Sequence, residues 1–263
     1  MNNSDTVRKL LRQAVPKSIY RLGAEIVNAI QVIRTNGFQT YVQLFHPAKN
    51  HTIKVDSVHL QNYQYPLFYR PGTPDVNTLI QNLIRKEYGQ FYPKSEPQWI
   101  IDAGGYIGDA SVYFLNRFSN CRVLCLEPDP ENYALAVRNL QSYSNRAVVL
   151  QKGLWSFPTR LSLSGSFVGT HLVEATYEND TVEVCDVETL LRDYGIDRLD
   201  ILKLDVEGAE DVILQESAQW LPKVKTLIVE FHGIDRRKKG IEFLQGQGFR
   251  HYEYRSLNYF SAV

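Results

Sequence analysis

Charged side chains end two apolar segments in the second half of the chain. Lys203, Asp205 and Glu207 are spaced at period two, which places them on one face of a predicted strand. Glu230 and His232 end a second apolar run with the same spacing. If the two strands are neighbours, these groups converge. Such a cluster costs desolvation and like-charge repulsion, which a fold tolerates mainly where the site is used.

Three uses of this cluster compete. A carboxylate or His232 could act as a general base that takes a proton from a substrate hydroxyl, and this is the use we favour. The same groups could instead bind a divalent metal that orients a diol, although we assign no metal ligand. The structural alternative is a Lys203–Asp205 ion pair, with Glu207 capping the next helix.

A glycine turn follows an apolar segment near the middle of the chain. Its spacing is Asp-x-Gly-x-x-x-Gly, which is typical of S-adenosylmethionine sites. A dinucleotide-binding site would have the spacing Gly-x-Gly-x-x-Gly instead. Glycine lets the backbone approach a ligand closely, and the following helix start offers N–H groups. The expected cofactor-binding residues of this turn are Asp102, Gly104, Gly105, Tyr106 and Gly108.

Further cofactor contacts are expected where the next strands end. Glu127, followed by Pro128, is placed to accept both hydroxyls of a ribose. Lys152 and Gly153 follow the third strand, where an adenine edge would lie, and Asp205 follows the fourth. The alternative is a tight turn without a ligand, with Glu127 as a solvated strand end.

Alternating strand and helix patterns must position these residues. Continuous apolar runs predict parallel strands, and helical spacing fills the gaps between them. We predict strands at 99–103, 122–127, 147–151, 200–206 and 226–231, and helices at 108–118, 130–143, 209–220 and 236–245. Residues 154–187 look like a β insertion. Runs at 252–254 and 259–263 predict a final hairpin at the sheet edge and not a further βαβ unit.

The first third of the chain has a different pattern. Residues 7–34 predict a basic amphipathic helix, which could touch an anionic membrane surface but more simply packs on its own domain. Short β-type runs at 39–45, 52–55 and 66–69 follow it, and Asp75 is a candidate N-cap for a helix. We therefore predict an N-terminal cap at 1–95 and a cofactor-binding domain at 96–263.

The composition does not identify a reaction, but it bears on the kind of partner, the state of the cysteines and the compartment. Of the 263 residues, 29 are Lys or Arg and 29 are Asp or Glu, so nothing electrostatic favours a nucleic-acid partner. Cys121, Cys125 and Cys185 show no metal-type spacing and are expected to be buried free thiols. No signal peptide or spanning segment is evident, which leads us to expect a cytoplasmic protein.

Taken together, the motifs resemble those of the FkbM family of S-adenosylmethionine-dependent methyltransferases. The similarity runs through residues 65–260 in order, and Lys203-Leu-Asp-Val-Glu-Gly-Ala-Glu210 is its most specific part. The other parts are Tyr65 to Asp75, the glycine turn, Glu127 to Asn132 and Val229 to His232. Tyr106 and Gly105 depart from the usual asparagine and alanine.

The resemblance implies a seven-stranded α/β sheet of Rossmann-like type, mostly parallel with an antiparallel last strand. It also implies O-methylation of a hydroxyl on a sugar, glycolipid or secondary metabolite. One alternative is a catalytically silent fold that serves as a binding partner in glycan synthesis. An NAD-type oxidoreductase is disfavoured by the glycine spacing, and a nucleic-acid methyltransferase by the sequence Asp205-Val-Glu207-Gly after the fourth strand.

Overall fold

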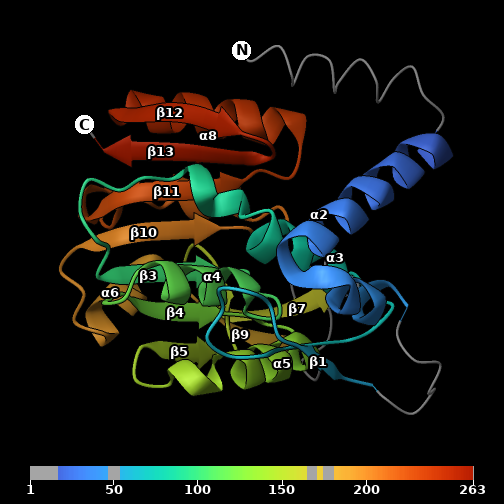
Figure 1. Ribbon diagram of the computed structural model, residues 1–263. Coiled ribbons are helices and arrows are strands. Elements are labelled where there is room, and N and C mark those ends of the chain that lie inside the picture. The colour runs from blue at the N-terminus through green and yellow to red at the C-terminus, as the bar shows by residue number, and fades with distance from the viewer. Residues whose placement is uncertain (1–16, 47–53, 165–170, 174–180, 263) are drawn as a thin grey trace. The chain divides into compact units, whose positions relative to one another are not determined.

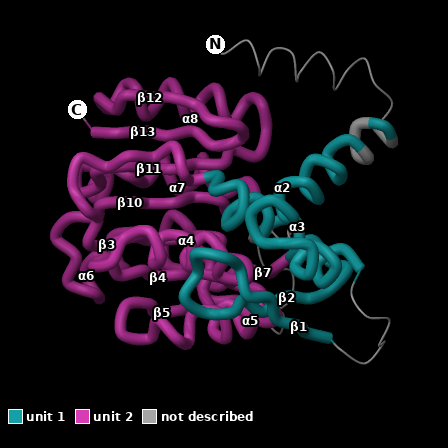
Figure 2. The backbone as a smooth tube through the Cα atoms, in the orientation of Figure 1, with its two compact units in different colours: residues 1–87 teal, residues 88–263 magenta. Residues whose placement is uncertain are grey.

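A computed structural model describes residues 17–46, 54–164, 171–173 and 181–262. The chain divides into two compact units, residues 1–87 and residues 88–263 (Figure 2). The functional division after residue 95 stays a prediction. The residues predicted to bind the cofactor or to act in catalysis all lie in the second unit.

The second unit is built on a seven-stranded sheet of order β12-β13-β11-β10-β3-β4-β5, visible from top to bottom in Figure 1. All strands are parallel except β13, which runs antiparallel to both neighbours. This confirms the predicted fold class. The strands are β3 (Trp99–Ala103), β4 (Arg122–Leu126), β5 (Ala147–Leu150), β10 (Leu199–Leu204), β11 (Val224–Glu230), β12 (Phe249–Tyr254) and β13 (Leu257–Ala262).

Helices cover both faces of this sheet. On one face, Ile101, Leu124, Leu202 and Leu227 join a buried core with residues of α6 (Val187–Asp193), α7 (Glu210–Gln215) and α8 (Ile234–Gly246). Because side chains alternate along a strand, Asp102 and Lys203 point to the opposite face. There Asp102 accepts a hydrogen bond from Ser111 of α4 (Asp109–Arg117), and α5 (Pro130–Leu140) packs beside α4.

The expected insertion forms a second sheet, of order β6-β9-β7-β8. Its strands are β6 (Gly153–Leu154), β7 (Thr159–Ser164), β8 (His171–Val173) and β9 (Thr181–Cys185). Residues 165–170 and 174–180 lie outside the described part of the insertion. The three cysteines are buried and free, as expected.

Two sequence predictions in this unit were wrong. The helix predicted over 209–220 is shorter, because α7 ends at Gln215 and a 3₁₀ turn at Leu221–Lys223 leads into β11. The predicted edge hairpin is present, since β12 pairs antiparallel with β13 at the sheet edge, but the exclusion of a further βαβ unit was wrong. β12 follows α8 and runs parallel to β11, so it completes a βαβ unit, and β13 then inserts between them.

The first unit combines one long helix with a small sheet. Helix α2 (Lys17–Phe45) has non-helical geometry at Gly37, and β1 (Asp56–Val58) pairs with β2 (Leu67–Tyr69). The strand predicted at 39–45 was wrong, because α2 continues through it. Of the run at 52–55, residues 52 and 53 lie outside the described residues, and residues 54 and 55 precede β1 without being part of a strand. Then come α3 (Asp75–Thr78), a π-helical turn at Leu79–Ile84 and a 3₁₀ turn at Glu87–Gln90, which crosses into the second unit.

The proposed N-cap role of Asp75 was also wrong. Pro74 holds that position, and the buried carboxylate of Asp75 pairs instead with Arg70, at 2.9 Å. Part of the predicted amphipathic helix, residues 7–16, lies outside the described residues. Within α2, Ile26, Val27 and Ile30 are about half exposed. No helix among the described residues has the length and apolar character needed to cross a membrane.

A buried ion pair joins the two central strands of the sheet. Lys203 lies opposite Asp102 in the β10–β3 register, and its Nζ is 3.0 Å from Asp102 Oδ1. The same ammonium donates to the Gly104 carbonyl at 2.9 Å and lies 3.6 Å from Asp205 Oδ2. Burial lowers the pKa of Lys203, but Asp102 and Asp205 outweigh it, so the pKa is held above its usual value. The lysine therefore stays charged.

We predict that Lys203→Met lowers the free energy of unfolding of the second unit by about 3–5 kcal/mol, because it leaves the Asp102 carboxylate buried without its cation. Adding Asp102→Asn should recover part of that loss. Urea titration followed by tryptophan fluorescence is the measurement, since all three tryptophans, Trp99, Trp155 and Trp220, lie in this unit.

Lys223→Met is the matched control. Lys223 pairs with Glu188, and both side chains are more than a third exposed, so its loss should change stability by only about 0–1 kcal/mol. Equal effects of the two lysine substitutions would contradict the role given to Lys203.

Candidate active site

The glycine turn after β3 draws three strand ends together. The amides of Gly104 and Gly105 both donate to the carbonyl of Leu126, at 3.1 and 2.8 Å. Gly104 has a φ of +76°, and a Cβ built there would lie 1.7 Å from the carbonyl oxygen of Asp205. Only glycine fits this approach. The carboxyl ends of β3, β4 and β10 therefore meet at one edge, the place where open α/β sheets bind ligands.

The turn is also tied to Glu127 at the end of β4. Tyr106 adopts a left-handed conformation, with a φ of 49°, and its amide donates to Glu127 Oε2 at 2.8 Å. Gly108 is left-handed as well and is the N-cap of α4. The expected cofactor-binding residues of the turn and Glu127 thus form one connected group.

Glu127 is nearly buried, at 6% exposure. Burial raises the pKa of this carboxyl to about 7, even though amide donors from Asp129 and Tyr106 act in the other direction. Oε1 accepts the Asp129 amide at 3.0 Å, and Pro128 between them is half-buried. A carboxylate has about four acceptor positions. The amides of Tyr106 and Asp129 and the Asn132 side chain, at 3.5 Å, use about three of them, so Glu127 can still accept a hydroxyl donor from a ligand.

The second group of predicted residues gathers at the ends of β10 and β11. His232 Nε2 lies 3.3 Å from Glu207 Oε2 and 3.8 Å from Asp205 Oδ1. All three side chains are about 30% exposed. The expectation that β10 and β11 are neighbours, and that these groups converge, is thus met by the geometry. Glu230 ends β11 opposite Leu257 and is not one of the three converging groups.

The route by which Glu207 reaches the cluster differs from the one predicted. Strand β10 ends at Leu204, so period-two alternation does not extend to Glu207, which has a left-handed φ of 50°. Glu207 does not cap α7 either: Ala209 holds the N-cap position, without a side-chain hydrogen bond. The turn at Glu207–Gly208 brings the carboxylate back toward His232.

Sequence reasoning missed the role of Glu210. This fully buried carboxylate, the first residue of α7, is 2.8 Å from His232 Nδ1 through Oε1. That hydrogen bond raises the pKa of His232 to about 9 against the effect of burial, and the charges of Glu207 and Asp205 add to it. One feature of the sequence could have indicated this role: Glu210 is an acidic residue at the start of a helix whose first turn must be buried against the sheet.

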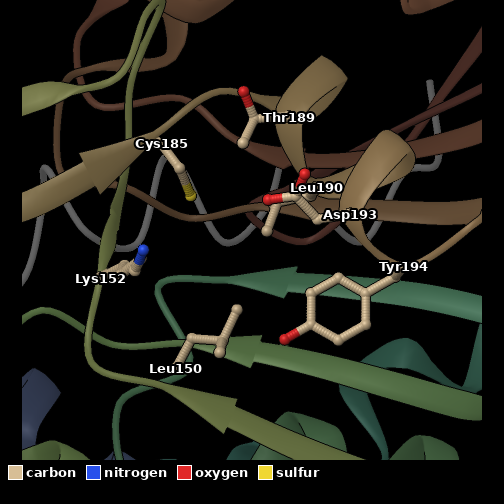
Figure 3. A pocket seen from close by; sticks show the side chains of 7 residues that line it. All are labelled: Leu150, Lys152, Cys185, Thr189, Leu190, Asp193 and Tyr194. Atoms are coloured by element: carbon tan, nitrogen blue, oxygen red, sulfur yellow. The ribbon is translucent and has the colours of Figure 1, made fainter.

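Lys152 and Gly153, expected near an adenine, lie beyond the end of β5. Gly153 belongs to β6, and Lys152 pairs with Glu183 at 3.2 Å. Lys152 also lines a cavity of about 330 Å³ (Figure 3). The other lining residues are Leu150, Cys185, Thr189, Leu190, Asp193 and Tyr194. Strand pairing joins Leu150 to Leu126, next to Glu127, so this cavity flanks the same sheet edge.

Two kinds of chemistry are therefore available along one edge. A turn of glycine and backbone amides beside a buried carboxylate suits a neutral or cationic ligand with hydroxyl donors. A half-exposed group of two carboxylates and an imidazole suits proton transfer or a cation. The two groups are linked through Lys203, which contacts Asp102, Gly104 and Asp205.

Comparison with known proteins agrees with this geometry. Residues 102–255 match the Methyltransferase FkbM domain. The methyltransferase sdnD of Sordaria araneosa is 28% identical over 170 residues, 50% of this chain and 65% of that protein. The hexuronic acid methyltransferase AglP of Haloferax volcanii is 27% identical over 144 residues, 53% of this chain and 59% of that protein.

The chain thus spans less than two thirds of either curated relative. Among solved structures, the methyltransferase FkbM of Methylobacillus flagellatus KT is 16% identical, with a TM-score of 0.45 over 70% of this chain and 53% of that one. The family match begins at Asp102 and covers the glycine turn and Glu127. It also covers Asp205, Glu207 and His232, which we call the carboxylate–histidine cluster. The chain belongs to the FkbM methyltransferase family.

Proposed function

We propose that this methyltransferase takes its methyl group from S-adenosylmethionine and transfers it to a hydroxyl of a sugar, glycolipid or secondary metabolite. The observation that carries the proposal is the glycine turn bonded to Glu127 inside the family-matched segment. The name of one relative, a hexuronic acid methyltransferase, supports a sugar-type acceptor.

The residues at the sheet edge fit this cofactor. Glu127 would hold the ribose, because its carboxylate keeps an acceptor position for a ribose hydroxyl beside its three protein donors. Asp102, Gly104, Gly105, Tyr106 and Gly108 would form the wall beside it, with Pro128, Lys152 and Gly153 toward the base. The cofactor supplies a methyl group on a positively charged sulfur.

The chain's own contribution is to position the acceptor and to take up its proton. With the cofactor bound, the acceptor hydroxyl would have to lose its proton to a residue of this chain. Asp205, Glu207, Glu230 and His232 are the proposed candidates for this proton, with Lys203 positioning Asp205. With a pKa of about 9, His232 is protonated at neutral pH, which favours a carboxylate as the first acceptor.

We predict that Glu127→Gln weakens binding of S-adenosylhomocysteine at least tenfold at pH 8, because a neutral amide replaces a charged acceptor. Wild-type affinity should increase as the pH rises from 6 to 8, since Glu127 loses its proton near a pKa of about 7. The variant should lose this pH dependence. Calorimetric titration measures both effects.

Glu242→Gln, an exposed change on α8, is the control and should keep the wild-type affinity and pH profile. Glu127→Gln binding as tightly as wild type would exclude Glu127 as the ribose ligand. Absence of any binding to the wild-type protein would overturn the choice of cofactor.

Acceptor chemistry can be tested with methyl-labelled S-adenosylmethionine and a pair of glycosides, one of a hexuronic acid and one of the matching neutral hexose. We expect label in a saccharide product that survives mild alkali, because a methyl ether is stable there and a methyl ester is hydrolysed. Mass spectrometry identifies the position. Alkali-labile label would show transfer to the carboxylate. Cofactor binding without transfer to any hydroxylated acceptor would favour the catalytically silent alternative.

A further inference from the structure

The carboxylate–histidine cluster has the dimensions of a metal site. One ligand atom from each of Asp205, Glu207 and His232 can be chosen so that all three lie within 4.8 Å of one another. The Nε2 distances to the two carboxylates are 3.3 and 3.8 Å. Ligands about 2.1 Å from a shared ion lie about 3.0–3.4 Å apart, so small side-chain movements would complete the geometry.

His232 is held in the orientation that a metal ligand needs. Its Nδ1 lies 2.8 Å from Glu210 Oε1, an oxygen that accepts and cannot donate when ionised. Nδ1–H therefore donates to Glu210, and Nε2 faces the carboxylates of Asp205 and Glu207. A carboxylate behind a histidine is the usual second partner of a metal-ligating imidazole.

With a neutral His232, this arrangement would place three acceptors face to face. A neutral imidazole has a lone pair on Nε2, and neither carboxylate can supply a hydrogen for it. Either a proton on Nε2 or a metal ion must lie between them. An ion pair of protonated His232 is thus the competing structural explanation.

The neighbouring cations are already engaged by other groups. Lys203 contacts Asp205 but is closer to Asp102, at 3.0 Å. Arg236 of α8 donates to the His232 carbonyl and pairs with Asp211, at 3.4 Å. Of these two cations, Lys203 is the one that contacts a carboxylate of the cluster, Asp205, and it shares its charge with Asp102.

Glu210 gives an independent observation. The residue is fully buried, and its Oε2 atom has no hydrogen-bond partner among the described residues. A buried carboxylate with an unsatisfied oxygen needs strong positive charge close by. A metal-bound imidazole would supply it through the hydrogen bond to Oε1.

We propose that Asp205, Glu207 and His232 form a binding site for one divalent cation, with Glu210 as the second-layer partner that orients His232. Two carboxylates and one imidazole form a mixed oxygen and nitrogen set, which suits Mn²⁺. Three protein ligands leave coordination positions open. This last step rests on the proposed function: the open positions would hold an oxygen of the acceptor.

The test is titration of the full-length protein with Mn²⁺ alone, followed by electron paramagnetic resonance, in which bound ion loses the sharp signal of free ion. We expect saturation at one ion per chain. Asp205→Asn, Glu207→Gln and His232→Asn should each weaken binding at least tenfold, and Glu210→Gln about tenfold. Thermal melts followed by circular dichroism check that each variant is folded.

The matched controls are His59→Asn and Glu242→Gln, which change exposed residues of the same types and should leave Mn²⁺ affinity unchanged. No saturable binding, or binding that survives all three ligand substitutions, would overturn the site and leave the ion pair as the explanation. A parallel titration with S-adenosylhomocysteine separates the proposals. Cofactor binding without Mn²⁺ binding rejects only the cation site, and the reverse result rejects only the cofactor.

Discussion

The site depends on one buried ammonium group. Lys203 has a side chain only 3% exposed, and it contacts Asp102 on β3, the Gly104 carbonyl in the turn and Asp205 beyond β10. A cation buried in this way must be surrounded by acceptors, so its presence fixes where those acceptors lie. Because the β10–β3 register sets Lys203 opposite Asp102, the strand pairing and the site geometry are one constraint.

That constraint explains why glycine is required at position 104. The Lys203 ammonium draws the Gly104 carbonyl inward while the Asp205 carbonyl occupies the space a Cβ would need. The turn can then reach Leu126 and Glu127 with its amides. A larger residue at 104 would separate β3 from β10, and with it the glycine turn from the carboxylate–histidine cluster.

The sequence was sufficient to predict the centre of the sheet because β3, β4 and β10 are buried on both faces. Continuous apolar runs around Ile101, Leu124 and Leu202 leave few alternatives to parallel strands. Prediction failed where local pattern and tertiary structure differ. The run at 39–45 is apolar enough for a strand, but it continues α2, and Phe249 begins β12 earlier than the aromatic run at 252 suggests.

The candidate site could be predicted in its residues but less well in its geometry. Strand alternation placed Lys203 and Asp205 on one face, and the structure shows their charged groups 3.6 Å apart, but the closer partner of Lys203, Asp102, was not predicted. It could not place Glu207, because a left-handed residue after the strand end reverses the direction of the chain. Glu210 was missed for a related reason: its importance comes from contact with His232, 22 residues away, which no local pattern encodes.

The two carboxylate groups of the sheet edge differ in ways that suit different tasks. Glu127 is buried against amide donors, and burial holds its pKa near 7, so it gains most from a ligand that brings hydroxyl donors. Asp205 and Glu207 are about 30% exposed and face an imidazole, so both solvent and a ligand can reach them. Lys203 holds the two environments side by side. They stay distinct because its closest carboxylate partner is Asp102, which is not one of these carboxylates. In the proposed function, Glu127 would bind the cofactor while Asp205, just beyond the end of β10, would take up the proton of the acceptor.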